Sequence, residues 1–318
     1  MSDAVLTTAD RPMRRPPLPR GVEDPGQIDR LTEINLGDLF RSFKLDHIRR
    51  GRGLLRAIFY LPARRFARAV AEYDRRVGEH GLAEGARWIL RYMSNRVQVH
   101  GAEHVPTEGP LLLLSNHPGL TDTMALFSSI PRGDLRIIAA VRPFLRELPN
   151  TSRQLIEVDE ADTAQRTGVL REAIAHLRAG GAVLTFPAGR IDPDPAVAPG
   201  ALDALATWSP SIALFARQVP QAVILPVLVS GVISAPALRH PITRLYRSKA
   251  DREWAAATLQ LLLPWYRRVT VSVAFGQPLR AADLAAGGRD AVLETAKAAM
   301  HDLILTYGRP EYGAGQMT

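Results

Sequence analysis

Short segments that are mostly or entirely apolar recur in this chain from about residue 96 onward, and they constrain its fold more than any other feature. The run Leu111–Leu114 consists of four leucines between a proline and a serine. A strand that is apolar at every position is usually buried on both faces, as in a parallel sheet that helices cover on both sides. Similar segments occur at 135–141, 155–158, 182–186, 222–228 and 269–275.

Helical patterns lie between these segments. The sequence predicts helices at 122–129 and 163–179, the second ended by Gly180 and Gly181. Residues 96–101 alternate apolar and polar side chains like a strand that ends in a turn. Short strands alternating with helices predict an α/β domain at 96–305, with a mainly parallel twisted sheet flanked by helices.

Residues 31–95 predict a helical extension that precedes the sheet. Apolar side chains cluster at 54–61, and arginines crowd around them at positions 49, 50, 52, 56, 64, 65 and 68. An apolar face beside a cationic face is typical of a helix lying on an anionic membrane surface. The alternative is a solvated basic helix packed on its own domain. Pro62 is expected to kink or split this helix.

The two ends of the chain differ in composition from the rest. Residues 1–30 are rich in Pro, Arg and Asp and predict a disordered tail, and 306–318 are assigned to a second tail. Residues 258–266 predict an apolar helix end with aromatic side chains, which suits the core, an acyl groove or contact with a bilayer.

The net charge of +8 favours an anionic partner. Nucleic acid is not expected, because the chain has neither zinc-finger spacing nor basic stretches interleaved with aromatic residues. Cysteine is absent, so disulfides and cysteine metal sites are excluded. There is no run of about 18 apolar residues and no recognisable secretory signal, which predicts a peripheral protein at the cytoplasmic face of the cell membrane.

A candidate catalytic pair lies in the segment 115–122, which reads Ser-Asn-His-Pro-Gly-Leu-Thr-Asp. In a continuous helix, residues five apart point about 140° away from each other. The Pro-Gly turn between His117 and Asp122 allows the imidazole to fold back onto the carboxylate. Asp122 would then hold one ring nitrogen, and the other would accept a proton from a hydroxyl, as in a serine-protease triad whose serine is replaced by a substrate alcohol.

Residue types and spacing alone leave a simpler interpretation open. Asp122 is also a typical residue for capping the first turn of a helix, and His117 is also compatible with a turn histidine.

Four blocks in order strengthen the catalytic interpretation. The first is Asn-His-x-x-x-x-Asp at 116–122, preceded by Gly101 and by Pro-Thr-Glu-Gly-Pro at 106–110. A strand ending at Asp159 stands second, and Phe-Pro-Ala-Gly-Arg at 186–190 follows a Gly-Gly pair and a strand. The fourth is an apolar strand with a proline at 223–227. Over about residues 96–280 the chain resembles the glycerolipid acyltransferase family, of the bacterial 1-acylglycerol-3-phosphate acyltransferase (PlsC) type.

The resemblance implies a reaction and a set of residues. His117 would be the general base on an acceptor hydroxyl, and Asp122 its orienting partner. The acyl donor would be acyl-CoA or acyl carrier protein as a co-substrate, and the acceptor a membrane lipid such as a lysophospholipid, without a cofactor or a metal. The residues expected to bind substrate are Asn116, Arg142, Phe186, Pro187, Gly189 and Arg190, and the loop 186–190 is a candidate oxyanion site.

The sequence departs from the family at four positions. Ala188 replaces a glutamate and Arg190 a threonine, and both Ile191 and Glu160 stand where the family has an arginine. The identity of the acceptor therefore stays open. Two alternatives remain: a catalytically inactive lipid-binding relative, and a lipid or thioester hydrolase, although the Gly-x-Ser-x-Gly elbow of many hydrolases is missing. Asp192 and Asp194 alternate with prolines, which favours turn formation over metal binding.

Overall fold

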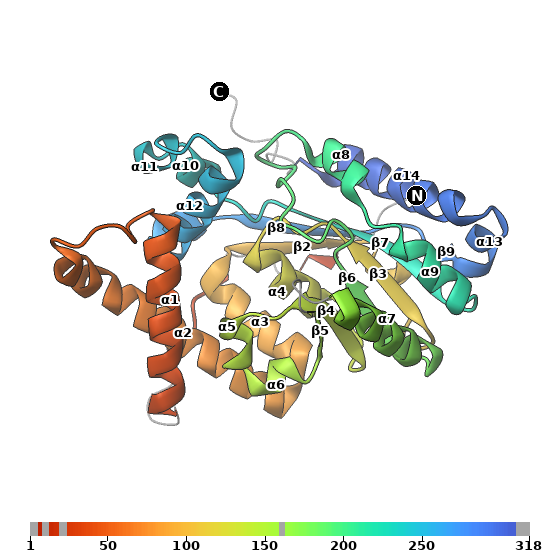
Figure 1. Ribbon diagram of the computed structural model, residues 1–318, viewed down its shortest axis with the longest axis horizontal. Coiled ribbons are helices and arrows are strands. Elements are labelled where there is room, and N and C mark those ends of the chain that lie inside the picture. The colour runs from red at the N-terminus through yellow and green to blue at the C-terminus, as the bar shows by residue number, and fades with distance from the viewer. Residues whose placement is uncertain (1–5, 8–12, 19–23, 159–162, 310–318) are drawn as a thin grey trace.

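The computed structural model describes residues 6–7, 13–18, 24–158 and 163–309, in which a nine-stranded sheet lies between helices (Figure 1). The strand order is β1-β2-β8-β7-β3-β6-β4-β5, and β9 pairs with β7. The strands are β1 (Leu6–Thr7), β2 (Arg96–His100), β3 (Leu111–Ser115), β4 (Leu135–Ala140), β5 (Leu155–Val158), β6 (Ala182–Thr185), β7 (Val223–Ser230), β8 (Thr270–Phe275) and β9 (Leu279–Arg280).

The pairing of the strands confirms the mainly parallel sheet. From β7 through β3, β6 and β4 to β5, every neighbouring pair is parallel. The pairs β1–β2, β7–β8 and β7–β9 are antiparallel, whereas β2–β8 is parallel. The apolar runs therefore sit where a doubly covered sheet requires them.

Strand β3 shows why its four leucines are all apolar. Leu111 and Leu113 face a core shared with α2, α3 and α4, whereas Leu112 and Leu114 face a second core shared with α7, α9 and α14. All four side chains are fully buried. The helices of these two layers are α2 (Arg52–His80), α3 (Leu82–Met93), α4 (Leu120–Ser129), α7 (Thr163–Arg178), α9 (Ser211–Gln218) and α14 (Arg289–Tyr307).

The N-terminal helices precede the sheet, as expected, but they begin earlier than predicted. Helix α1 spans Pro25–Ser42, and Asp24 caps it by accepting a hydrogen bond from Gly26. Ile28 is buried in the first core, so the last six residues of the predicted tail, 25–30, belong to α1. Within the predicted tail, Met13 also donates its N–H to the Asn95 carbonyl. The positions 1–5, 8–12 and 19–23 of that tail lie outside the described residues, as do 310–318.

Helix α2 runs without a break through Pro62, so of the two expected effects of this proline, a kink or a split, the helix is not split. Proline removes one N–H, and the carbonyl that it leaves unpaired belongs to Ile58 four residues earlier. The Ile58 side chain is 57% exposed, so water has access to this part of the helix.

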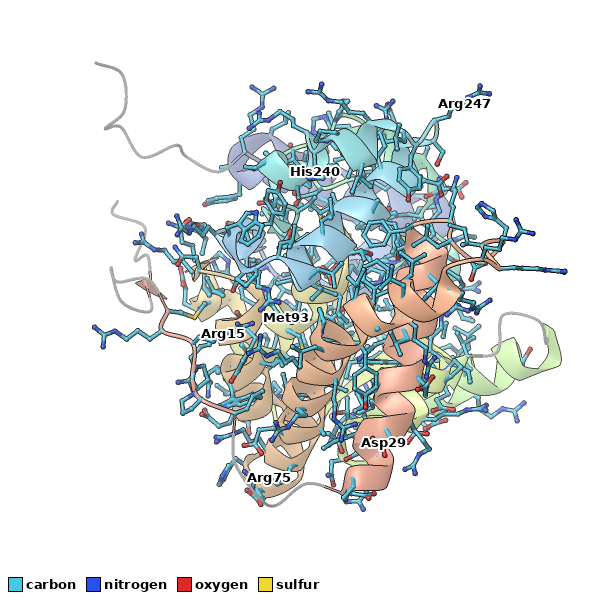
Figure 2. All side chains as sticks on the ribbon, turned by 90° about the vertical axis from the view of Figure 1, so that its left-hand side faces the viewer. Arg15, Asp29, Arg75, Met93, His240 and Arg247 are labelled. Atoms are coloured by element: carbon cyan, nitrogen blue, oxygen red, sulfur yellow. The ribbon has the colours of Figure 1, made fainter. Side chains whose placement is uncertain are left out.

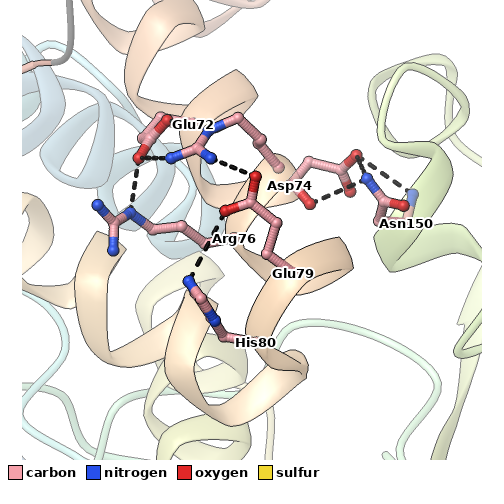
Figure 3. Close-up of polar contacts among 7 residues, drawn as sticks. Glu72, Asp74, Arg76, Glu79, His80 and Asn150 are labelled. Atoms are coloured by element: carbon pink, nitrogen blue, oxygen red, sulfur yellow. Dashed lines mark hydrogen bonds and ion pairs between the residues drawn. The ribbon is translucent and has the colours of Figure 1, made fainter.

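The C-terminal half of α2 is fixed to the domain by buried polar contacts (Figure 3). Asp74 accepts hydrogen bonds from the backbone and hydroxyl of Thr151, at 2.8 and 2.7 Å, and from Asn150. Both partners belong to α6 (Pro149–Ser152). On the neighbouring turn, Glu72 pairs with Arg75 and Arg76. Two arginines of α2 that lie outside the predicted basic cluster are thus neutralised within the helix itself.

The remaining helices surround the edges of the sheet. They are α5 (Pro143–Arg146), α8 (Ala201–Ala204), α10 (Ala235–Leu238), α11 (Pro241–Arg244), α12 (Lys249–Leu262) and α13 (Ala281–Ala286), with single 3-10 turns at Ala102–His104, Leu205–Thr207 and Pro264–Arg267. Helices α10, α11 and α12 lie above α1 and α2 at the left of Figure 1. Within the described part of the chain, no helix is long and apolar enough to cross a membrane.

Candidate active site

The candidate site lies at the carboxyl edge of the sheet. Because β3, β6 and β7 are neighbours and parallel, the segments that follow them meet at one edge. His117 follows β3, and Phe186 follows β6. The structure therefore brings together the first and third sequence blocks, which lie about 70 residues apart in the chain.

The turn between His117 and Asp122 places the two side chains in contact. Gly119 adopts φ 156° and ψ −165°, a conformation that side chains larger than hydrogen strongly disfavour. Helix α4 begins directly after it, with Asp122 in its first turn. The Nδ1 of His117 then lies 2.8 Å from Oδ2 of Asp122.

Asp122 combines the two roles that the sequence left open. Its Oδ2 also accepts the backbone N–H of Gly119 at 3.1 Å, and its Oδ1 accepts the N–H and hydroxyl of Thr123. The side chain is fully buried. A carboxylate that accepts from Nδ1 requires the proton of the neutral imidazole to sit there, so the lone pair of His117 is at Nε2.

The imidazole of His117 is held from the side by Phe186. The two rings stack with centroids 4.4 Å apart and an interplanar angle of 28°. The His117 side chain is 28% exposed, and among the described residues Nε2 has no recorded hydrogen-bond partner. The ring is therefore fixed in position while one nitrogen remains available for a proton.

Opposing effects set the pKa of His117. Burial favours the neutral imidazole, whereas the charge and hydrogen bond of Asp122 and the charge of Asp192 favour the cation. The carboxylates prevail and raise the pKa of His117 above its ordinary value.

Asn116 has a role different from the expected contact with substrate. Its Nδ2 donates to the carbonyl of Val229, and its Oδ1 accepts the N–H of the same residue, both at 2.8 Å. The side chain is buried, with 5% of it exposed. Since both ends of the amide are occupied, Asn116 extends the β3–β7 pairing past the end of β3 and fixes the residue before His117.

The loop after β6 is a tight turn next to His117. The N–H of Gly189 donates to the carbonyl of Phe186 at 3.0 Å, and Gly189 has a φ of 63°. This N–H is thus already used within the turn. Pro187 is buried and its carbonyl accepts from Ser209, whereas Arg190 is exposed. Of the residues expected to bind substrate in this loop, Phe186 is the one that contacts His117.

Arg142 lies at the same edge but farther from His117. It follows β4, which is separated from β3 by β6, and strands are spaced by about 4.8 Å. About 10 Å of sheet therefore separates the strands that carry the two residues. Glu160, one of the positions at which the sequence departs from the family pattern, lies outside the described residues.

Two aspartates that the sequence analysis treated as turn formers organise this edge. Asp192 exchanges two hydrogen bonds with the backbone of His117. Asp194 is completely buried and accepts the N–H groups of Ala196, Gly231 and Ile233, which ties its loop to the end of β7. The sequence signal was the alternation of aspartate and proline at 192–195, in the loop that follows β6.

Comparisons with known proteins agree with the sequence blocks. Residues 96–230 match the protein-family model described as Acyltransferase. Among solved structures, the crystal structure of the 1-acyl-sn-glycerophosphate (LPA) acyltransferase PlsC from Thermotoga maritima is 19% identical to this chain, with a TM-score of 0.40 over 87% of this chain and 94% of that chain. No curated protein sequence matches the chain.

Proposed function

We propose that this protein, whose residues 96–230 carry the sequence pattern of an acyltransferase, moves a fatty acyl group from an acyl thioester to the hydroxyl of a lysophospholipid or related lipid. The donor is acyl-CoA or the acylated form of acyl carrier protein. The observation that carries the proposal is the 2.8 Å contact between Nδ1 of His117 and Oδ2 of Asp122, which leaves Nε2 as a base.

The proposed reaction follows from this geometry. Nε2 of His117 takes the proton of the acceptor hydroxyl as the oxygen attacks the thioester carbonyl. The tetrahedral intermediate then expels the thiolate, to which the imidazolium returns the proton. Asp122 stabilises the imidazolium while it exists and keeps the ring in one orientation. The products are an ester and a free thiol, so no oxidant or metal enters the balance.

An apolar cavity supports an acyl chain as part of the substrate. A cavity of about 350 Å³ lies between α2, α3 and α12, with mostly apolar walls that include Leu61, Phe66 and Leu261. Arg15, Arg65 and Arg267 also line it and add positive charge to its wall. A smaller cavity of about 40 Å³ lies against Pro118–Thr121, and Leu261 lines both. We propose that the acyl chain runs along this apolar path, which extends the earlier expectation for 258–266.

The face formed by α1, α2 and α12 is proposed to rest on a membrane surface at the cytoplasmic face (Figure 2). On α2, Leu54, Ile58 and Leu61 are 70, 57 and 59% exposed, and Trp265 is 59% exposed. Exposed arginines lie beside them at positions 49, 50, 52 and 65. Apolar side chains next to cationic ones fit the interface of an anionic bilayer.

The proposal is tested with purified protein, labelled acyl-CoA or acyl carrier protein, and a panel of lysolipids. We expect an acylated lipid from the wild type, and a loss of at least about 10³-fold in His117→Gln with an unchanged circular dichroism spectrum. Equal rates in the two proteins would refute the proposal. Release of free fatty acid without an acceptor would identify a hydrolase instead, and lipid binding without turnover an inactive relative.

A further inference from the structure

Asp192 is joined to the backbone of His117 in both directions. Its Oδ2 accepts the N–H of His117 at 3.1 Å, and its own N–H donates to the carbonyl of His117 at 2.9 Å. The two residues exchange hydrogen bonds as paired strand residues do, except that one acceptor is the Asp192 side chain and not a backbone carbonyl. The loop after β6 thereby fixes the position of the residue that carries the proposed base.

The second carboxylate oxygen of Asp192, Oδ1, does not take part in these hydrogen bonds. Oδ1 is buried and has no hydrogen-bond partner among the described residues, and only 3% of Asp192 is exposed. A buried carboxylate oxygen without a partner is costly. An asparagine or a serine at this position would accept the same N–H without burying a charge. A structural clamp alone therefore does not account for a carboxylate here.

We propose, on the basis of the proposed function, that Asp192 is a positioning residue for the acyl transfer, which holds the backbone of His117 and places a second negative charge beside its imidazole. The charge favours the cation that forms when His117 takes the acceptor's proton. Asp122 acts on the ring from α4, and Asp192 acts from the opposite loop. The exposed Arg190 is the cation that acts on Asp192.

The electrostatics of the site agree with this role. Burial, with a smaller contribution from the charge of Asp122, raises the pKa of Asp192 above its ordinary value, while the N–H and charge of His117 and the charge of Arg190 oppose that rise without cancelling it. Asp192 in turn contributes to the raised pKa of His117. Each group therefore favours the charged form of the other, as expected of an ion pair placed in a partly closed site.

The test measures the titration of the His117 imidazole by NMR on ¹⁵N-histidine-labelled protein without substrate. The His117 signals are those that disappear in His117→Gln. We expect the pKa of His117 to fall by about one unit in Asp192→Asn and in Asp192→Ser, because both keep an acceptor for the His117 N–H but remove the charge. Asp203→Asn is the matched control, since it removes an exposed carboxylate and should leave the pKa of His117 unchanged.

Thermal unfolding distinguishes the effect of the Asp192 charge from the effect of its hydrogen bond to the His117 backbone. Asp192→Ser should unfold at or above the wild-type temperature, because it keeps an acceptor and removes the unpartnered buried oxygen, whereas Asp192→Ala loses the clamp and should unfold at a lower temperature. Asp192→Asn removes the buried charge but places an amide nitrogen where that oxygen was, so it should unfold close to the wild-type temperature. In acyl transfer, the acid limb of kcat/KM should move to lower pH in Asp192→Asn by the same amount as the titration.

An unchanged His117 pKa in both uncharged variants would overturn the proposal and leave Asp192 as a structural residue. That result would not affect acyl transfer by His117. Conversely, the absence of any acyl transfer would refute the proposed function, while the titration would still report on Asp192.

Discussion

Oδ2 of Asp122 binds both the imidazole of His117 and the backbone N–H of Gly119, so one carboxylate oxygen fixes the ring and the turn that delivers it. The same side chain starts α4 through its contacts with Thr123. Orientation of the base and initiation of the helix therefore depend on each other.

Replacing Asp122 by asparagine should separate these two roles. The amide side chain could still accept from Gly119, but it would no longer stabilise an imidazolium and could hold the wrong tautomer of His117. We expect kcat to fall by about 10³- to 10⁴-fold with a melting temperature close to that of the wild type. Asp122→Ala should lose a similar factor in kcat and, in addition, about 1 kcal/mol of stability because the helix start loses its acceptor. A kcat within tenfold of the wild type in Asp122→Asn would contradict the assigned role.

The rate should depend on pH through the neutral form of His117. Its pKa is raised in the folded protein, so the acid limb of kcat/KM should have its midpoint above the ordinary histidine value of about 6.5. Activity then rises as the pH passes upward through this midpoint. A profile measured with a saturating donor checks this, and a midpoint below 6.5 would show that the carboxylates do not control the ring.

The same group should make stability depend on pH in the opposite sense. Because the pKa of His117 is higher in the folded than in the unfolded chain, its contribution to stability is complete below about 6.5. The contribution is lost as the pH rises through the folded value. The difference in unfolding free energy between the wild type and His117→Gln, measured by urea titration from about pH 5 to 9, should shrink with increasing pH. A difference that is constant over this range would argue against the shift.

Removal of the Asn116 amide should affect both stability and rate. Asn116→Ala leaves the N–H and carbonyl of Val229 unpaired in the core, which costs about 2 to 4 kcal/mol. Since the next residue is His117, we also expect kcat to fall by about tenfold. Thr151→Val is a suitable control, because it removes a buried hydrogen bond to Asp74 far from the site and should lower stability without changing kcat. Equal kcat values for the wild type and Asn116→Ala would limit this residue to a structural role.

Membrane contact through α2 is open to a direct test. Changing Leu54, Ile58 and Leu61 together to serine should weaken binding to anionic vesicles by about tenfold or more, because apolar surface no longer enters the interface. Leu305→Ser on α14 changes a side chain that is 65% exposed and should bind like the wild type. Wild-type binding should also weaken as salt is added. Co-sedimentation that does not depend on salt or on anionic lipid would exclude the proposed surface.

The sheet could be predicted from the sequence because its signals are local. The run Leu111–Leu114 must be buried on both faces wherever it pairs, whereas the segments at 135–141 and 155–158 are apolar enough to predict strands but are only partly buried. The start of α1 could not be predicted in this way. Residues 25–30 look like part of a polar tail until Ile28 is seen to pack against the domain, so tertiary contacts decide the boundary.

The candidate site also combines contacts between residues close in sequence, which could be predicted, with contacts between distant residues, which could not. His117 and Asp122 are five positions apart, and a glycine turn between them is visible in the sequence. The partner of Asn116 lies 113 positions away, and Asp192 is 75 positions from His117. Such contacts depend on the order of β7, β3 and β6 in the sheet, which the individual segments do not specify.

The His117–Asp122 contact has a consequence for how the sequence of this protein can change in evolution or by engineering. Both side chains, and the glycine turn that joins them, come from one short stretch that runs from the end of β3 into the first turn of α4. The loops after β4 and β5, which carry Arg142 and the segment leading to the altered family position, belong to other parts of the chain. If the protein is the acyltransferase proposed above, its selectivity for the acceptor can therefore change, or be exchanged by grafting those loops, while the His117–Asp122 pair and its turn are inherited together.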